Sequence, residues 1–503
     1  MKHHLLLIHC VLLCFQLNAT ILHVGNGYPH ATLPDAVQSV FPGDTIRIHE
    51  GVYPGGLYFE NLQGEPGAWI TIESAPGASV IFEGGNNAWQ CTDAAYLILR
   101  GIIFQHQTGN GLNFDDGGTY ETPAHHIRFE NCTFSDINAT GNNDLLKLSG
   151  LDSFEIRSCI FLNGAEGGSG IDMVGCHDGL IVNSHFENLG SNSIQAKGGT
   201  RNIRIEANLF RNGGQRALNL GGSTGLPFFR PIDAPYEAAE LKAYSNVFVG
   251  STAPVAFVGS INCEFINNTI YLPEKWVLRI LQETVDITRF PPCGNNTFRN
   301  NILYLDERVS VECNIGPNTD PGSFIFSNNF WYHIDNMTWT GPNLPAPDED
   351  NIVGEDPLFE NATSENFDLL AGSPAIGHGF DVLLPSHDHT GNAFNHPRSI
   401  GAFEGEPATR IPVPLPEKHN LYLLYPNPAK GEVTMELSFP HAAIVKASVY
   451  TLSGECVSTG SPLKQISEGM LSADVSGLQP GLYMMVIEFE NARPVSKLFF
   501  KGG

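Results

Sequence analysis

Short segments in which apolar and polar residues alternate recur along most of the chain. Eight of them end in a large apolar residue: Phe134, Phe161, Phe186, Phe210, Phe248, Ile270, Leu303 and Trp331. The gaps between these residues run from 22 to 38. Alternation with a period of two is typical of a β-strand that buries one face, so each segment predicts a short strand.

A second series of short alternating segments, most of them closed by Gly, lies between the first. Its members are GLNFDDG, LLKLSG, GIDMVG, SIQAKGG, ALNLGG, PVAFVG and VLRIL, which begin at residues 111, 145, 170, 193, 217, 254 and 277. The connections contain no helical pattern, although parallel strands normally need a crossover helix. The pattern therefore predicts a solenoid, in which parallel strands pair between successive coils and loops of different length leave the core constant.

A row of small or polar residues precedes the apolar ends by two positions. It comprises Cys132, Cys159, Ser184, Asn208, Asn246, Asn268, Asn301 and Asn329. Asparagine tolerates left-handed backbone and its amide can bond to the same residue in the next coil. We expect a stacked turn row with a structural role.

The arrangement resembles the right-handed parallel β-helix of the pectate-lyase-like fold, over about residues 21–404. The opening segment, DAVQSVFPGDTIRIHEGVY, is similar to the N-terminal cap of this family, with a short helix over Pro34–Val40 that covers the core. The segments EDPLF, GSPAIGHG and SIGAFE near the end are also similar to the family. The expected fold is all-β, with a β-helix domain over 20–404.

Both ends of the chain carry signals for export. Lys2, the apolar run Leu5–Leu17 and Ala19 predict a signal peptide over 1–19, too short to span a membrane. A Pro-rich linker follows the β-helix at 405–420.

Residues 421–503 predict a small β-sandwich. The pieces Pro426-Asn427-Pro428, Val449-Tyr450, Val475 to Tyr483 and Lys497 to Lys501 occur in order. They closely resemble the C-terminal sorting domain of the type IX secretion system. The resemblance implies a Gram-negative bacterium of the Bacteroidetes type, the type IX machinery as a partner, and a location outside the cell or on the outer-membrane surface.

The formal net charge of −26 argues against binding of nucleic acids or anionic membranes, which requires clustered Lys and Arg. It leaves an anionic substrate open, because a polyanion needs only a locally basic groove. The eight cysteines beyond the signal peptide match no zinc or small-disulfide spacing.

Aligning the Gly-ended strands places polar residues in outward rows, with equivalent residues of neighbouring coils about 4.8 Å apart. One row is Asn113, Lys147, Asp172, Gln195, Asn219, Ala256 and Arg279. The next is Asp115, Ser149, Val174, Lys197, Gly221, Val258 and Leu281, and a corner row holds Asn110, Asp144, Ser169, Asn192 and Arg216. This stripe of mixed charge suits a polymer, because successive sugars can meet successive coils.

Two glycan chemistries fit such a stripe. A uronan lyase needs a base to remove the proton beside a carboxylate, and a cation or Ca²⁺ to neutralise that carboxylate. A hydrolase needs two carboxyl groups around the glycosidic oxygen. Asp115 and Asp172 lie two coils apart, about 9.6 Å, which is compatible with an inverting hydrolase.

The stretch Asn192–Gly225 resembles the core of the chondroitinase B and alginate lyase family, polysaccharide lyase family six. Lys197 matches the family's base. The place of the acid arginine falls near Leu220-Gly221, with Arg216 as a neighbour. The calcium-binding carboxylates of the family would fall near Gly190 and Asn192, where this chain has none, so calcium is a cofactor that the resemblance alone suggests.

These patterns predict a secreted lyase that cleaves an acidic polysaccharide by β-elimination. The predicted catalytic residues are Lys197, Arg216 and Asp172, and the predicted substrate-binding residues are Lys147, Gln195, Asn219, Arg230, Arg279 and Tyr236. Arg230 and Tyr236 belong to a long insertion, LPFFRPIDAPYEAAE. The alternatives are a non-catalytic adhesin or glycan-binding solenoid and an inverting glycoside hydrolase.

Two further patterns concern cations. Glu237 and Glu283 are candidate cation ligands, or else members of ordinary surface salt bridges. His387 and His389 flank Asp388 in a closing loop, where a metal site needs further ligands that the sequence does not name.

Overall fold

The computed structural model describes residues 19–120, 122, 124–406, 421–437, 444–451, 456–459, 464–467, 470–489 and 492–502. The predicted signal peptide, up to residue 18, and most of the predicted linker lie outside the described residues. The chain divides into two compact units, one ending at Pro407 and the other beginning at Ala408. Each is described by itself.

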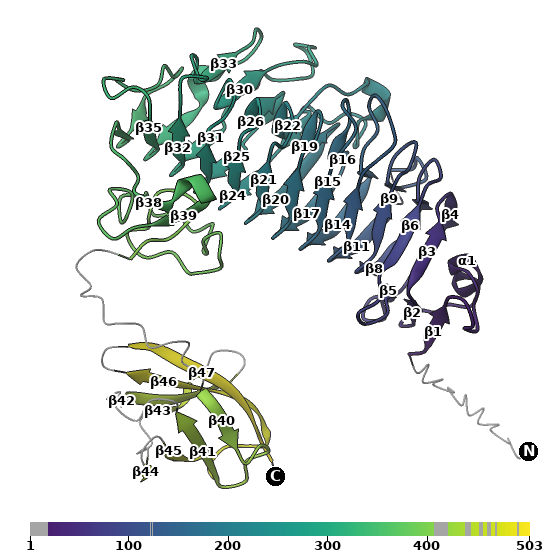
Figure 1. Cartoon of the computed structure of the whole chain (residues 1–503), viewed down its shortest axis with the longest axis vertical. Coiled ribbons are helices and arrows are strands. Elements are labelled where there is room, and N and C mark those ends of the chain that lie inside the picture. The colour runs from purple at the N-terminus through teal and green to yellow at the C-terminus, as the bar shows by residue number, and fades with distance from the viewer. Residues whose placement is uncertain are drawn as a thin grey trace, which may run out of the picture. The chain divides into compact units, whose positions relative to one another are not determined.

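The first unit is a parallel β-helix, as predicted (Figure 1). Its 15-stranded sheet contains β1 (Ile21–Val24), β2 (Thr45–Ile48), β5 (Ile70–Ser74), β8 (Ala95–Arg100), β11 (Ala124–Glu130), β14 (Leu151–Arg157), β17 (His177–Val182), β20 (Thr200–Glu206), β24 (Lys242–Tyr244), β28 (Glu264–Ile266), β31 (Thr297–Arg299), β34 (Ile325–Ser327) and β36 (Asp348–Glu349), with β23 (Ala238–Ala239) and β27 (Ser260–Ile261) beside them.

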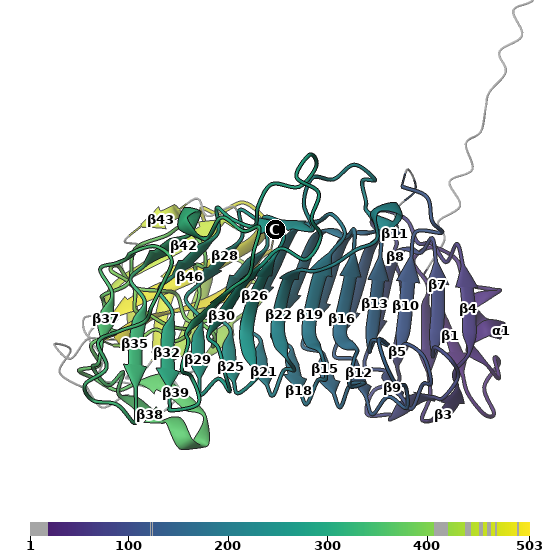
Figure 2. The same cartoon turned by 90° about the horizontal axis from the view of Figure 1, so that it is seen from above.

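Two further sheets complete each coil. The 12-stranded sheet runs through β3 (Gly51–Pro54), β6 (Val80–Glu83), β9 (Ile103–Gln105), β12 (Thr133–Ser135), β15 (Ile160–Leu162), β18 (His185–Glu187), β21 (Leu209–Arg211), β25 (Val247–Val249), β29 (Thr269–Tyr271), β32 (Ile302–Leu305), β35 (Phe330–His333) and β37 (Ile352–Val353). The 10-stranded sheet runs through β4 (Leu57–Glu60), β7 (Trp89–Thr92), β10 (Leu112–Asp115), β13 (Leu146–Ser149), β16 (Ser169–Val174), β19 (Asn192–Lys197), β22 (Arg216–Gly221), β26 (Ala253–Val258), β30 (Leu278–Leu281) and β33 (Cys313–Ile315). Figure 2 shows the strands of this last sheet side by side, with long loops at one edge.

The ends of the β-helix use shorter elements. Helix α1 (Leu33–Val37) packs the buried Leu33 and Ala36 at the N-terminal end, and is shorter than the predicted Pro34–Val40. It begins at a capping box in which Thr32 and Asp35 satisfy each other's backbone N–H groups. The C-terminal end carries the antiparallel pair β38 (Phe359–Asn361) and β39 (Asn366–Leu369), which the short 3₁₀ turn η3 (Ala362–Ser364) connects. Two further 3₁₀ turns are η1 (Leu226–Phe228) and η2 (Pro321–Ser323).

The predicted apolar row forms a continuous stack in the core. Phe134, Phe161, Phe186, Phe210 and Phe248 pair in register, and their ring centroids are 4.7 to 4.9 Å apart. The register continues through Ile270, Leu303 and Trp331. All of these side chains are buried, so the stack holds the coils in register over most of the unit.

The predicted amide ladder is confirmed. Asn246 Nδ2 donates to Asn268 Oδ1 at 3.1 Å, and Asn268 Nδ2 donates to Asn301 Oδ1 at 3.1 Å. The same amide groups also donate to backbone carbonyls of the preceding coil, as Asn268 Nδ2 does to Ala243 at 3.0 Å. Each ladder side chain therefore bridges its neighbours on both sides.

The left-handed backbone of this turn falls one residue earlier than expected. It is at Ser245, Asn267 and Asn300, with φ between 52° and 56°, rather than at the ladder residues that follow them. Ser245 also donates its hydroxyl to the backbone carbonyl of His387 at 2.9 Å. The left-handed position accepts several residue types, whereas the ladder position is Asn in five successive coils, from Asn208 to Asn329.

Removing one rung of the ladder has a measurable cost. Asn268→Ala leaves the backbone N–H of Asn246 and the backbone carbonyl of Ala243 without their partners inside the core. We expect the free energy of unfolding to fall by about 1–3 kcal/mol. Urea unfolding followed by circular dichroism measures it, and Asn343→Ala, at an exposed position, is the control with a small effect. Equal losses for both variants would contradict a special role for the ladder.

The second unit consists of two four-stranded antiparallel sheets, as the predicted β-sandwich requires. One contains β40 (Leu421–Tyr425), β41 (Glu432–Leu437), β45 (Met470–Asp474) and β44 (Lys464–Ser467). The other contains β43 (Cys456–Thr459), β42 (Ile444–Thr451), β46 (Gly481–Phe489) and β47 (Ala492–Lys501).

Candidate functional site

The outward row of the 10-stranded sheet has the predicted register. Lys147 pairs with Asp172, Asp172 with Gln195, and Gln195 with Asn219. Ala256 and Arg279 continue the row on β26 and β30. From Lys147 to Arg279 the row crosses five strand spacings, about 24 Å, so it is long enough for several sugar units.

The second predicted row is wrong at one step. A register shift between Gln195 and Ala196 pairs Ala196 with Gly221, so Lys197 does not lie opposite Gly221 as the alignment predicted. The extra residue of this irregularity is Leu220 on β22, whereas Lys197 keeps its predicted pairing with Val174 of β16.

The side chain of Lys197, at the end of β19, points back toward the outward row. Its Nζ donates to Gln195 Oε1 at 3.0 Å and lies 3.3 Å from Asp172 Oδ1. Arg216, at the other end of its strand, leans forward, and its Nη1 donates to Asn219 Oδ1 at 3.3 Å. Because Gln195 and Asn219 are paired neighbours, the two cations approach the row from opposite sides.

Asp172 is shared by two lysines. Lys147 Nζ contacts its Oδ2, and Lys197 Nζ approaches its Oδ1. The Asp172 side chain is fully buried, although the alternation predicted an outward residue, because these long side chains cover it. Burial would lower the pKa of Lys147, but the carboxylates of Asp172 and Asp144 outweigh it, so that its pKa is raised and Lys147 remains a cation.

Asp144 adds a titratable carboxylate at the corner before β13. Its Oδ1 accepts from the backbone N–H of Ser169 at 2.8 Å, and its Oδ2 lies 3.4 Å from Lys147 Nζ. Burial, and next the negative charge of Asp172, raise the pKa of Asp144 to about 6. The charge of the row therefore becomes more positive as the pH falls through this value.

This titration predicts a pH-dependent affinity for anionic polymers. Protonation of Asp144 removes one negative charge beside Lys147, so an anion binds more tightly below the pKa than above it. We expect up to about a tenfold change across two pH units, since one charge near a protein surface is worth roughly a factor of ten. Calorimetric titration with an acidic oligosaccharide measures it, and Asp144→Asn is expected to flatten the profile. A wild-type affinity that rises with pH would contradict the assignment.

The far end of the row is also basic. Arg279 Nε donates to Asn314 Oδ1 at 2.9 Å, and its guanidinium lies 4.6 Å from the centre of the Trp276 ring. Burial, and next the charge of Arg216, lower the pKa of Arg279. Arg216 itself pairs with Glu283 at 2.7 Å. Lys147, Lys197, Arg216 and Arg279 thus place four cations along one row of an acidic protein.

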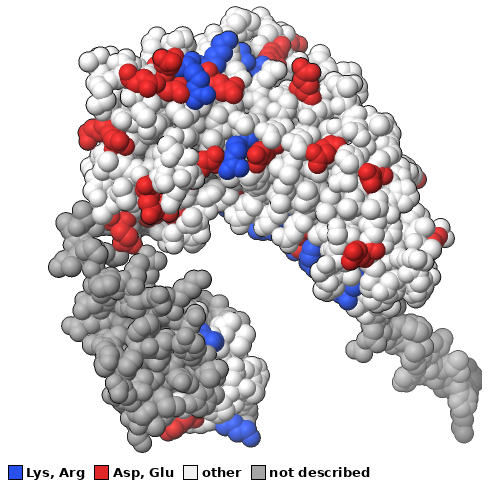
Figure 3. Space-filling model, in the orientation of Figure 1, with Lys and Arg blue, Asp and Glu red and all other residues white. Residues whose placement is uncertain are grey.

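Several other cations of the β-helix also lie in local ion pairs. On the 12-stranded sheet, Arg211 is paired with Glu187 at 3.1 Å and also with Glu365. Figure 3 shows one face of the molecule, on which Lys and Arg side chains lie beside Asp and Glu and most of the surface is uncharged. On that face, several of the positive charges of the described residues therefore have acidic neighbours.

Arg230 and Tyr236 lie away from the row. Arg230 is buried, and its Nη1 donates to Asp152 Oδ1 at 2.8 Å and to the carbonyl of Gly175 at 2.9 Å. Its guanidinium also stacks 5.0 Å from the centre of the Tyr120 ring. Tyr236 interacts with Arg201 of the 15-stranded sheet. Both residues hold the insertion against the corner of the coil, so Arg230 serves the fold of the insertion.

Glu237 is not in a surface salt bridge, the simpler of its two predicted roles, but joins the loops beside the row. This fully buried carboxylate accepts from the backbone N–H groups of Gly198 at 2.9 Å and Thr224 at 2.8 Å. It also accepts from Thr224 Oγ1 at 2.7 Å and from the hydroxyl of Thr284. One carboxylate therefore fixes the turn after Lys197 to two loops that are distant in sequence.

The residues around Lys197 do not fit a calcium site. The nearby carboxylates, Asp172 and Asp144, are both turned toward lysine, and Gly190 and Asn192 provide no carboxylate. Within the part of the chain that the structure describes, no three His, Cys, Asp or Glu side chains are grouped to hold a metal ion. In the closing loop, Asp388 accepts from the N–H groups of Thr390 and Asn392, so its carboxylate serves the loop itself.

Comparisons with known proteins bear on both units. The family model for the secretion system C-terminal sorting domain matches residues 423–501. Residues 423–501 are a sorting domain. This domain indicates export by a Gram-negative bacterium of the Bacteroidetes type to the exterior or the cell surface. In the described residues, no helix is long and apolar enough to cross a membrane.

The β-helix is similar to solved structures of carbohydrate-active proteins. Pectate lyase Pel9A is 16% identical, with a TM-score of 0.51 over 77% of this chain and 96% of that one. The complex of XylC with xylose is 11% identical, with a TM-score of 0.49 over 77% and 98%. An alginate lyase from Paenibacillus sp. str. FPU-7 is 16% identical, with a TM-score of 0.42 over 61% and 99%. At these identities the likeness establishes the fold alone, and no curated protein matches the sequence.

Proposed function

We propose that the β-helix binds an acidic polysaccharide along the outward row of the 10-stranded sheet and cleaves it by β-elimination. The observation that carries the proposal is the convergence of Lys147, Lys197 and Arg216 on the row, with Arg279 further along it. A carboxylate-bearing chain laid along the coils meets these cations in succession. The sorting domain supports the proposal, because an exported protein meets polysaccharides outside the cell.

The proposed chemistry gives the cations different tasks. Lys147 keeps its charge and neutralises the carboxylate of the bound uronate, which acidifies the neighbouring C–H. Lys197 acts as the general base that removes that proton, while Arg216 donates a hydrogen bond to the departing glycosidic oxygen. The C–O bond then breaks, a C=C bond forms in the uronate, and the departing oxygen takes a proton from the solvent to become a hydroxyl group. Asp172 positions both lysines.

A second candidate function is glycan binding without cleavage. It is favoured by the pairing of the cations, since Lys147 and Lys197 share Asp172 and Arg216 is bound to Glu283. The hydrolase alternative has less support, because Asp172 is fully buried between two lysines, whereas a hydrolytic carboxyl group must reach the glycosidic oxygen or a water molecule.

One assay separates these functions. The mature chain is incubated with polygalacturonate, alginate and glycosaminoglycans, while ultraviolet absorbance follows the unsaturated uronate and a colorimetric assay follows reducing ends. Elimination gives both signals, and hydrolysis gives reducing ends alone. Neither signal, together with retention on an immobilised polymer, would establish the binding function and overturn the lyase proposal.

A further inference from the structure

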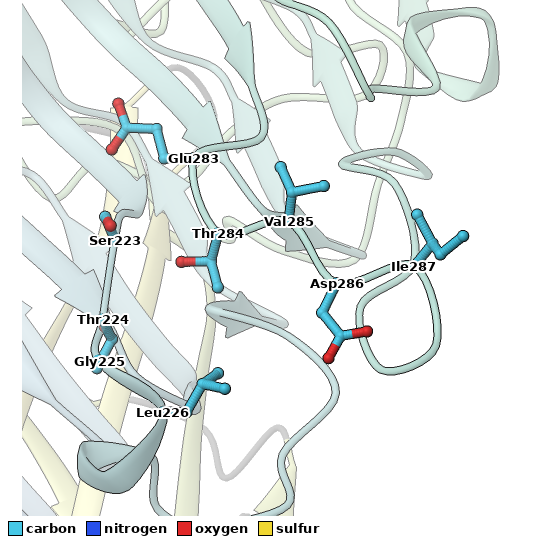
Figure 4. A pocket seen from close by; sticks show the side chains of 9 residues that line it. All are labelled: Ser223, Thr224, Gly225, Leu226, Glu283, Thr284, Val285, Asp286 and Ile287. Atoms are coloured by element: carbon cyan, nitrogen blue, oxygen red, sulfur yellow. The ribbon is translucent and has the colours of Figure 1, made fainter.

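A pocket opens beside Lys197, between two loops of the β-helix. Its volume is about 700 Å³, and it is lined by Ser223, Thr224, Gly225, Leu226, Glu283, Thr284, Val285, Asp286 and Ile287. Figure 4 shows the two facing segments, with Leu226 and Asp286 pointing into the space between them. The first segment follows β22 and the second follows β30.

The pocket adjoins the row. A methyl group built on Gly222, the residue before the first segment, would lie 2.9 Å from Gln195 Nε2 and 3.2 Å from Lys197 Cδ. The first of the two segments that line the pocket therefore begins next to the side chains of Gln195 and Lys197. The buried Glu237 ties Thr224 and Thr284 to the turn after Lys197, so both walls have fixed positions relative to the row.

The charge of the pocket is opposite to that of the row. None of its nine lining residues is a Lys or Arg, whereas Glu283 and Asp286 are both acidic; the Glu283 carboxylate is paired with Arg216 of the row, so Asp286 carries the negative charge of the pocket. Hydrogen bonds from the side chain and backbone of Thr288 lower the pKa of Asp286, so this carboxylate is ionised at neutral pH. An anionic sugar unit is repelled here, while the exposed Leu226 and Val285 offer apolar contact at the rim.

We infer that the pocket receives an uncharged sugar unit, next to the anionic unit whose carboxylate is held by Lys147. The inference rests on the proposed function and narrows its substrate class. The polymer is one in which charged units adjoin units that lack a carboxylate or carry it as an ester. Asp286 then disfavours a unit with a free carboxylate by charge repulsion. Leu226 contacts the apolar face of the uncharged unit.

The test uses the mature full-length chain with polygalacturonate and alginate, each as the free carboxylate and in a partly methyl-esterified form. Affinity is measured by calorimetry for the wild type, Asp286→Lys and Asp233→Lys. Asp233 is an exposed residue of the neighbouring insertion outside the pocket lining, so its variant changes the net charge equally. We expect the wild type to prefer an esterified form, and Asp286→Lys to raise affinity for the free form about tenfold relative to Asp233→Lys.

The outcomes distinguish the inference from the proposed function. A preference for the esterified polymer that is reduced in Asp286→Lys and kept in Asp233→Lys supports the inference. Tight binding of the free form by the wild type, with the same response in both variants, overturns the inference and leaves the proposed function standing. Failure of every polymer to bind overturns the proposed function and the inference with it.

Discussion

Lys197→Met is expected to reduce depolymerisation of the acidic polysaccharide by about 10²- to 10⁴-fold, the range for loss of a positioned general base. Methionine keeps much of the length and the apolar stem of the side chain but removes the nitrogen that approaches Gln195 and Asp172. Because Lys147 and Arg216 remain, the affinity for the polymer should fall much less than the turnover. The measurement compares kcat and KM from the ultraviolet signal of the unsaturated product.

The matched control for this variant is Lys242→Met. Lys242 is half-buried and lies on the 15-stranded sheet, away from the row. We expect its activity to equal that of the wild type. If Lys197→Met retained full activity, Lys197 would not be the base and the proposed division of tasks would be wrong.

Asp172→Ala is expected to lower the free energy of unfolding by about 3–5 kcal/mol, the cost of removing one partner from a buried ion pair. The substitution leaves Lys147 and Lys197 without the carboxylate that both approach, and it removes a fully buried side chain. Chemical denaturation of the full chain, read in the transition of the β-helix, measures the loss.

Two further variants identify the cause of this loss. Lys147→Met combined with Asp172→Leu removes a charge of each sign, and should recover part of the stability because a buried pair can be replaced by apolar groups. Asp115→Ala removes a carboxylate that is only half-buried and should cost less. A loss for Asp172→Ala no larger than for Asp115→Ala would contradict the shared ion pair.

Much of the fold follows from the sequence because equivalent positions in successive coils of the β-helix have the same environment. The apolar row from Phe134 to Trp331 and the ladder from Asn246 to Asn301 occupy equivalent places in each coil, so aligning them predicts the strand pairing. The same alignment predicts that Lys147, Asp172, Gln195, Asn219 and Arg279 share a row.

The site was predictable only in part, because its details depend on departures from the repeat. The register shift after Gln195 cannot be read from an alternating pattern, and it displaces Gly221 from the predicted position opposite Lys197. The burial of Arg230 against Asp152 depends on how the insertion folds back, which spacing does not specify. The buried position of Glu237 was not predictable either, because its partners come from three separate loops.

The central claim is that the outward row of the 10-stranded sheet holds an anionic polymer. The most direct measurement is a crystal structure of the Lys197→Met variant with an acidic oligosaccharide chosen from the binding panel. We expect the sugar chain along the row, with its carboxylates near Lys147, Arg216 or Arg279. A sugar chain bound on the 15-stranded or 12-stranded sheet instead, with the charged side chains of the row still paired with one another, would contradict this claim.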